Sequence, residues 1–497
     1  MAADWALEEM RTVDLKDART NARLLEILTQ LGARSSASIP EACGGHAEMT
    51  AAYRLFDNGK VTFQGILEPH QDRTRERIAA QKTVLLVQDT TEIDLTRPAR
   101  QVEGAGPLDG GARQGLLLHL LHAFTPDGTP LGTLDAHPWA RDAGKPPNAK
   151  STRAQRAAIP IEEKESHRWV RFLRSAALEA ARSPGTRHIC LSDSEGDIYE
   201  LLASGLPSID WIVRACQDRA LVLPQEETPA AQAENQTPAQ AAGEGTGRAK
   251  ATLQSHLLAQ PVLYTQTIQV RGRERKIACE KRGRRQPRLS REARVEVRSA
   301  SITLRPPWRS DRQLPAVTVN AVLVSEIDPP GEDTPIQWLL LTSLPVADAD
   351  QAREVVEFYC GRWMIEVLFR VLKSGCRVEE RRFENLDRVL NCLAVYLIIA
   401  WRSLYVCRLG RACPEMDCQA IFEPEEWKSV WKVMRNTNPP DRPPPLGEII
   451  ILVAQLGGYV VRKNSPPGPQ TIWLGLQRTH DFAMCWKMFG PSAVRVK

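Results

Sequence analysis

The pattern of apolar and polar residues divides the chain into a helical beginning, a mixed middle and a helical end. Residues 5 to about 70 carry apolar side chains at helical spacing, as in the segment Asp17 to Leu31, whose other faces hold Arg19 and Arg23. A small helical domain with exposed arginines can enter a DNA groove, but a plain helical cap has the same pattern. The sequence leaves both interpretations open.

Short apolar runs that are typical of buried strands begin near residue 80. Two of them end in a carboxylate, the first at Asp89 and the second at Asp193. Further strands are expected at 116–124, 129–139 and 211–214, with helices at 163–182 and from 196 to 202. Three strands, helix, strand, helix, strand is the order of an RNase H-like α/β layer.

The later part of the chain departs from this order. Residues 224–247 contain few large apolar side chains, which predicts a disordered insert. Strands follow between 262 and 343, including 317–324 and 337–341, and after Asp348 the pattern is helical to about Cys407. The expected fold class is therefore α/β. Its expected parts are a helical domain at 1–70, an RNase H-like catalytic domain at 71–410 with a β-rich insertion at about 220–345, and a helical domain at 411–497.

Charge is concentrated in one block. Residues 271–298 hold twelve Lys or Arg and four Glu, a net charge of +8 in a chain whose total is +5. A basic block on an otherwise near-neutral protein suits a phosphate-binding surface, and it suits a solvated charged hairpin equally well.

The cysteines and the apolar stretches indicate in which cellular compartment the protein is expected. The eleven cysteines form no Cys-x-x-Cys pair, which argues against a zinc ribbon or a disulfide framework and indicates reduced thiols in a cytoplasmic protein. The first residues lack the pattern of a signal peptide. The longest apolar stretch, Leu393 to Trp401, is too short for a hydrocarbon layer of about 30 Å. We expect a buried helix and no membrane partner.

The helix after Asp348 carries an unusual stripe. At about 100° per residue, Tyr359, Arg362, Glu366 and Lys373 fall within one arc of about 60°, and Arg370 lies beside it. Such a stripe can be a solvated surface with an i,i+4 ion pair. It also suits a site where the carboxylate holds a cation and the phenol and cations hold phosphate oxygens.

The spacing of this stripe resembles a known signature. Tyr359, Arg362, Glu366 and Lys373 match the Y-(2)-R-(3)-E-(6)-K pattern of the IS-four family of bacterial insertion-sequence transposases, the group that includes the Tn-five transposase. The segments Asp89-Thr-Thr-Glu and Asp193-Ser-Glu-Gly-Asp-Ile look like that family's first and second aspartate motifs. The similarity runs across nearly the whole chain, including the Trp5-Ala6 opening and the 456–458 turn.

The resemblance implies that Asp89, Asp193 and Glu366 form a metal-binding catalytic triad. Hard oxygen ligands suit Mg²⁺, with Mn²⁺ as a substitute. Two such ions about 4 Å apart can activate the attacking oxygen and stabilise the leaving one. The implied function is cut-and-paste transposition, by strand nicking, hairpin formation and resolution, and strand transfer.

The resemblance also implies how DNA is held. Phosphates of the transposon end would be bound by the stripe residues Tyr359, Arg362, Arg370 and Lys373, together with Arg214. Trp338 would stack on a base flipped out of the duplex, although without the resemblance a core tryptophan would be the better interpretation. The implied partners are transposon-end DNA, target DNA and a second copy of the chain, with dimerisation through the C-terminal helices.

Two features depart from the family pattern. Ser194 stands where close relatives carry arginine, and residues 221–250 form a longer segment than expected. Both suggest lower activity. Two alternatives stay open: a catalytically reduced or domesticated protein that binds DNA as a regulator through the helical N-terminus and the basic block, and a metal-dependent nuclease without strand transfer.

Overall fold

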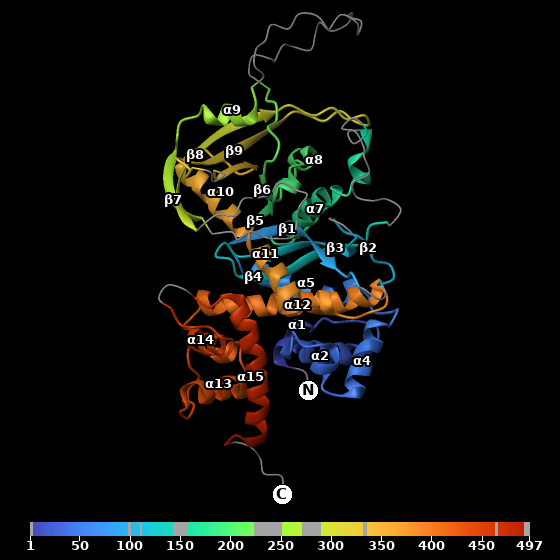
Figure 1. Cartoon of the computed structure of the whole chain (residues 1–497). Helices are drawn as coiled ribbons and strands as arrows, with labels where there is room; N and C mark the ends of the chain where they lie inside the picture. Colours follow the sequence, from blue (N-terminus) through green and yellow to red (C-terminus); the bar gives the residue numbers. More distant parts are fainter. Residues whose placement is uncertain are drawn as a thin grey trace, which may run out of the picture. The chain divides into compact units, whose positions relative to one another are not determined.

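The computed structural model describes residues 3–97, 101–109, 112–142, 155, 158–222, 251–270, 290–331, 335–462 and 466–491 (Figure 1). The chain forms two compact units, and each is described by itself. The first unit contains Met1–Lys150, Glu179–His188 and Gly361–Lys497, and the second contains Ser151–Leu178 and Ile189–Cys360. The predicted disordered insert at 224–247 and most of the basic block, residues 271–289, lie outside the described residues.

The first unit begins with helices, as the periodicity predicts. They are α1 (Asp4–Glu9), α2 (Ala18–Ala33), α3 (Ile39–Cys43), α4 (His46–Phe56) and α5 (Phe63–Ala79). The Asp17 carboxylate begins α2 by accepting hydrogen bonds from the backbone N–H groups of Arg19 and Thr20. The apolar face of α2 is buried, while Arg19 is exposed and Arg23 is partly exposed.

Four strands of the first unit pair antiparallel. They are β1 (Thr83–Asp94), β2 (Gly106–Pro107), β3 (Gln114–Phe124) and β4 (Pro130–Trp139), and the other three all pair with β3. The expected end of β1 at Asp89 was wrong. The strand continues to Asp94, because the ladder with β3 runs on through polar residues that give no apolar signal. Asp89 therefore lies within the strand, opposite Leu120.

Helices complete the first unit. They are α11 (Met364–Arg370), α12 (Leu386–Ala412), α13 (Pro424–Arg435), α14 (Leu446–Leu456) and α15 (Pro469–Phe489). α12 packs against α5 and β4, and α13 and α14 pack against α15. α12 has 27 residues, longer than the predicted stretch, and is long and apolar enough to cross a membrane. However, 78% of its most apolar window is buried inside the protein, as for a core helix.

The second unit contains a mixed sheet. Its strands are β5 (Arg187–Ser192), β6 (Asp210–Arg214), β7 (Tyr264–Val270), β8 (Arg291–Leu304), β9 (Val317–Glu326) and β10 (Gln337–Thr342), in the order β5-β6-β10-β9-β8-β7. β5 and β6 are parallel, and the other neighbours are antiparallel. The helices are α7 (His167–Arg182), α8 (Tyr199–Leu202), α9 (Leu253–Leu258) and α10 (Ala349–Gly361).

The predicted single helix from Tyr359 to Lys373 was wrong. α10 ends at Gly361, α11 begins at Met364, and a π-helical turn occupies Val371–Gly375. Glycine weakens the helix at the first break, and at the second the Cys376 N–H donates to the Val371 carbonyl five residues back, at 2.8 Å. The common arc calculated for an uninterrupted helix therefore does not hold.

Candidate active site

Arg362 connects two of the three candidate carboxylates within the first unit. Its Nη1 donates to Asp89 Oδ2 at 3.1 Å, and its Nη2 donates to Glu366 Oε1 at 2.7 Å. Asp89 comes from β1 and Glu366 from α11, 277 positions later in the sequence. One guanidinium thus brings together side chains that the sequence could place only on separate elements.

This arrangement fits a cation site. The Asp89 and Arg362 side chains are each 14% exposed, and that of Glu366 is 34% exposed. The positively charged guanidinium is held by one oxygen from each carboxylate. A metal cation could be bound by the same two oxygens, because carboxylate oxygens favour positive charge of either kind. Among the described residues, no group of three His, Cys, Asp or Glu side chains lies close enough to hold a metal ion.

The packing of α11 explains why Glu366 faces this position. Met364, Ile365, Leu368 and Phe369 are buried, so they hold α11 against the rest of the first unit. Ile365 and Glu366 donate their N–H groups to carbonyls only three residues back, at 3.3 and 3.2 Å, so the helix starts tightly. The turn before it places Arg362 beside the carboxylate of Glu366, as the i,i+4 spacing predicted.

The remaining cations of the stripe have different surroundings. Lys373 lies in the π-helical turn and its Nζ is 3.7 Å from Glu379 Oε1. That same oxygen accepts a hydrogen bond from the Asp94 backbone N–H at 3.0 Å. Arg370 ends α11 and is exposed to solvent. An ion pair at a surface contributes little, about 0–1 kcal/mol, so Lys373 can exchange Glu379 for a phosphate at small cost.

Asp193 lies in the second unit, directly after β5, where the sequence placed it. Its Oδ1 accepts a hydrogen bond from the Glu195 N–H at 2.8 Å, which begins a 3₁₀ turn over Ser194–Gly196. A Cβ on Gly196 would lie 2.6 Å from the Cβ of Ser192, so only glycine lets the turn fold back on the strand. The turn therefore holds the Asp193 carboxylate at the end of β5.

Asp197, in the same segment, has a structural role. Its side chain is fully buried and accepts hydrogen bonds from the N–H groups of Cys216 and Gln217, at 2.9 and 3.0 Å. Arg219 donates to the same carboxylate at 2.6 and 3.2 Å. The pair joins the turn after Asp193 to the segment after β6. Its residues are 22 positions apart, and no local pattern indicates the partner.

Three further candidates gather in the second unit. The rings of Trp338, on β10, and Tyr359, near the end of α10, meet edge to face with centroids 6.2 Å apart. Arg214 ends β6 and donates to the backbone carbonyl of Gln337 at 3.3 Å. Trp338 is partly exposed, so the predicted alternative of a core tryptophan is not what the structure has.

The candidates divide between the two units. The first unit holds Asp89, Arg362, Glu366, Arg370 and Lys373, and the second holds Asp193, Arg214, Trp338 and Tyr359. Other acidic residues near the motifs have their own partners, since Glu92 pairs with Arg113 at 2.6 Å and Glu195 with Arg168 at 2.7 Å. Arg19 and Arg23 lie on α2, which precedes all of these candidates in the sequence.

Comparison with protein families gives three matches along the chain. Residues 2–61 match the family model described as "Transposase DNA-binding", residues 210–401 match "Transposase DDE domain", and residues 398–488 match "Transposase Tn5 dimerisation domain". The DDE match covers Arg214, Trp338 and the whole stripe from Tyr359 to Lys373. A DDE domain has an RNase H-like core, in agreement with the fold class predicted from the order of elements.

One solved structure is a distant neighbour. It is titled "Cryo-EM structure of piggyBac transposase synaptic complex with hairpin DNA", with 9% sequence identity and a TM-score of 0.34. The similarity covers 82% of this chain and 72% of that one. At this score the likeness carries no argument about the site.

Proposed function

Because this chain belongs to the DDE transposases of the Tn5 type, we propose that Asp89, Asp193 and Glu366 form its catalytic triad. The protein is a DNA transposase that acts on DNA as a dimer, since it combines a DNA-binding, a DDE and a dimerisation region. The proposed activity is cut-and-paste transposition of an insertion sequence through nicking, hairpin formation and resolution, and strand transfer.

One observation supports the triad most. Two oxygens, one from Asp89 and one from Glu366, point at the same guanidinium within the first unit. The proposal adds Asp193 as the third carboxylate. The Asp193 carboxylate has one oxygen engaged by the Glu195 N–H, and its other oxygen has no partner among the described residues.

Transposase DDE domains depend on divalent metal ions, and we propose Mg²⁺, with Mn²⁺ able to replace it. Bound there, the metal would lower the energy of the attacking and leaving oxygens at the scissile phosphate. The three carboxylates would hold it with oxygen ligands. Arg362 would turn from the carboxylates to a phosphate oxygen, which its planar donor fork suits.

The other contacts follow from position. Lys373 and Arg370 would bind phosphates beside Glu366, and Tyr359 and Arg214 would bind them in the second unit. Trp338 would receive a flipped base on its ring, since it is partly exposed and braced by Tyr359. Arg19 and Arg23 would contact transposon-end DNA from α2, and the protein would work in the bacterial cytoplasm at the nucleoid.

The proposed domain boundaries are 1–70 for end binding, 71–410 for catalysis and 411–497 for dimerisation. The family matches at 2–61 and 398–488 support the two outer functions. The catalytic region would include the strands β7 to β9 as an insertion before the glutamate helix.

The test is cleavage of a duplex that carries the DNA flanking the gene. We expect Asp89→Ala, Asp193→Ala and Glu366→Ala each to abolish Mg²⁺-dependent strand cleavage while binding of the end duplex stays near the wild-type level. Asp350→Ala is the matched control, because its side chain is 92% exposed and, among the described residues, pairs only with Arg353 on the same helix. It should cut normally.

Each alternative has its own outcome. Full cleavage by Glu366→Ala would overturn the triad. Wild-type protein that binds the ends but cuts with neither Mg²⁺ nor Mn²⁺ would favour the DNA-binding regulator. Cleavage without joining of 3′-hydroxyl ends to a target duplex would favour the nuclease.

A further inference from the structure

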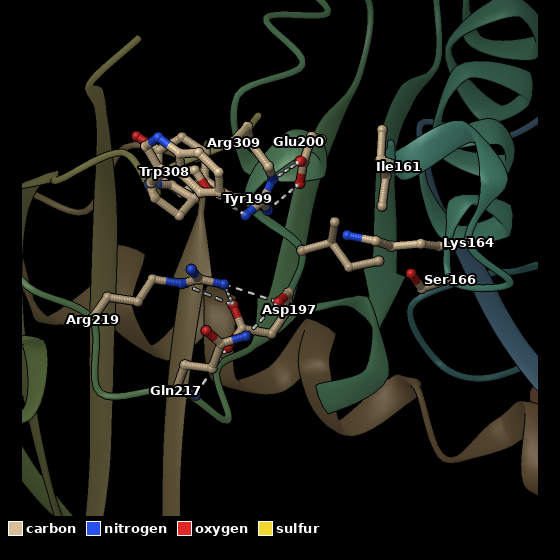
Figure 2. A pocket seen from close by; sticks show the side chains of 12 residues that line it. Ile161, Lys164, Ser166, Asp197, Tyr199, Glu200, Gln217, Arg219, Trp308 and Arg309 are labelled. Atoms are coloured by element: carbon tan, nitrogen blue, oxygen red, sulfur yellow. Dashed lines mark hydrogen bonds and ion pairs between the residues drawn. The ribbon is translucent and has the colours of Figure 1, made fainter. Parts of the chain in front are cut away.

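The second unit contains a pocket that the proposed triad does not use. Its volume is about 490 Å³, and it lies between the segment 161–166, the segment 197–200 and the loop 307–309 (Figure 2). This volume is within the range of roughly 300–1,000 Å³ that is common for small-ligand sites. One wall is formed by Asp197, four positions after the candidate carboxylate Asp193.

Of the cations that line the pocket among the described residues, only Lys164 forms no close ion pair. Arg219 is paired with Asp197 at 2.6 Å, and Arg309 with Glu200 at 2.6 and 3.1 Å. The ammonium group of Lys164 makes no hydrogen bond or ion pair with any described residue, and it points into the pocket (Figure 2). The pocket therefore offers a single positive charge to an incoming anion.

The surroundings of Lys164 favour an anionic ligand. Burial lowers the pKa of Lys164 and the nearby charge of Arg309 lowers it further, while Glu200 and Asp311 offset part of this decrease. A bound anion would offset both effects, since an opposite charge stabilises the protonated amine. The Ser166 hydroxyl also lines the pocket, and among the described residues it has no hydrogen-bond partner. An ammonium and a hydroxyl two positions apart suit the oxygens of one phosphate.

Trp308 supplies an aromatic surface on the opposite side of the pocket (Figure 2). Its side chain is 70% exposed, although tryptophan is usually largely buried. The loop that carries it is held in place. Ser310 Oγ donates to the Ala158 carbonyl at 3.0 Å, and the Tyr199 hydroxyl donates to the Pro315 carbonyl at 2.7 Å. A large exposed ring on a fixed loop is a suitable stacking platform.

We propose that this pocket binds one unpaired nucleotide of a DNA strand, with the base stacked on Trp308 and the phosphate held by Lys164 and Ser166. The inference rests on the proposed function, because it takes DNA as the ligand. Base stacking tolerates any base, so the pocket would read the unpaired state and not the sequence. The strand can come from the transposon end or from target DNA, which present the same chemistry.

The test measures binding without metal, so that it does not depend on cleavage. Two labelled duplexes are compared by fluorescence anisotropy in EDTA: a blunt transposon-end duplex and the same duplex with a five-nucleotide single-stranded extension. Wild-type protein should bind the extended duplex more tightly. Trp308→Ala and Lys164→Ala should each weaken binding of the extended duplex about tenfold, which is the order of one base stack or one phosphate contact. Binding of the blunt duplex should not change.

Conservative and matched variants separate the proposed contacts from general effects. Trp308→Phe and Lys164→Arg should retain most of the preference, since they keep a ring and a charge. Leu178→Ala removes a 68% exposed apolar side chain, and Arg174→Ala removes an exposed cation, both on α7. Neither should alter the preference.

The inference is overturned if wild-type protein binds both duplexes equally, or if Trp308→Ala weakens both to the same extent. An extended duplex of unrelated sequence identifies the source of the strand. A Trp308→Ala effect confined to the transposon end points to the end strand, and an equal effect on both sequences includes target DNA. Failure of the triad variants to lose cleavage would refute the proposed triad and leave this binding result intact.

Discussion

Replacement of Asp197 tests how the turn that carries Asp193 is held. The Asp197 carboxylate accepts four hydrogen bonds, two from backbone N–H groups and two from Arg219, and both side chains of the pair are nearly inaccessible to solvent. Removing one partner of a buried ion pair costs about 3–5 kcal/mol, because the remaining charge stays buried. We expect Asp197→Ala to destabilise this region by about 4 kcal/mol. Asp197→Asn should cost about half as much, since it keeps one acceptor oxygen.

Hydrogen exchange measures this cost locally, at the N–H groups of Cys216 and Gln217. A loss of about 4 kcal/mol corresponds to exchange that is roughly a thousand times faster, at tenfold for each 1.4 kcal/mol. Arg219→Ala should have a similar effect. The double variant should cost less than the sum of the two, by about 1–3 kcal/mol, because no unpaired charge remains.

Two results would refute this reasoning. One is exchange in Asp197→Ala that is accelerated less than tenfold, which would mean that the carboxylate does not hold the segment. The other is strict additivity of Asp197→Ala and Arg219→Ala, which would mean that the two side chains act separately. Exchange in α2, which lies in the other unit, serves as the internal control and should stay unchanged.

Two further predictions concern the first unit. Arg362→Lys keeps the positive charge but loses the fork that reaches two carboxylates, so single-turnover nicking should fall about 10- to 100-fold; a wild-type rate would contradict the assigned contact. Burial alone would raise the pKa of Glu9, but His70 and Arg77 outweigh it and lower that pKa to about 2. Since the folded pKa is below the unfolded value, the stabilisation of about 3 kcal/mol is present above pH 4.5 and is lost as the pH falls toward 2. Urea unfolding should follow this trend, and Glu9→Gln should be less stable at pH 7 with a flatter acid profile.

Much of the architecture follows from local sequence patterns. The periodicity of α2 and the apolar runs of β5 and β6 lie within single elements, and each agrees with the structure. Arg362 and Glu366 also form the ion pair that their i,i+4 spacing predicts, although Arg362 lies in the turn before α11. Such patterns can be predicted from the sequence because the apolar residues within one helix or strand recur with the period of that element.

The errors of prediction have a common physical cause. β1 extends past Asp89 because its partner strand β3 supplies hydrogen bonds to residues with no apolar signal. The stripe from Tyr359 to Lys373 is broken twice because backbone hydrogen bonding shifts to other registers at the two breaks. In both cases backbone hydrogen bonds set where the element ends. The spacing of apolar side chains does not indicate these bonds.

The sequence by itself therefore determined the kind of fold, the order of its elements and the residues at family spacing around Glu366. Tertiary structure alone decided that Asp89 shares Arg362 with Glu366, that Asp197 is held by Arg219, and that Trp308 and Lys164 line one pocket. These contacts join residues from 22 to 273 positions apart. The distance in space between such residues is set by how whole helices and strands pack. A pattern within one short segment therefore cannot predict it.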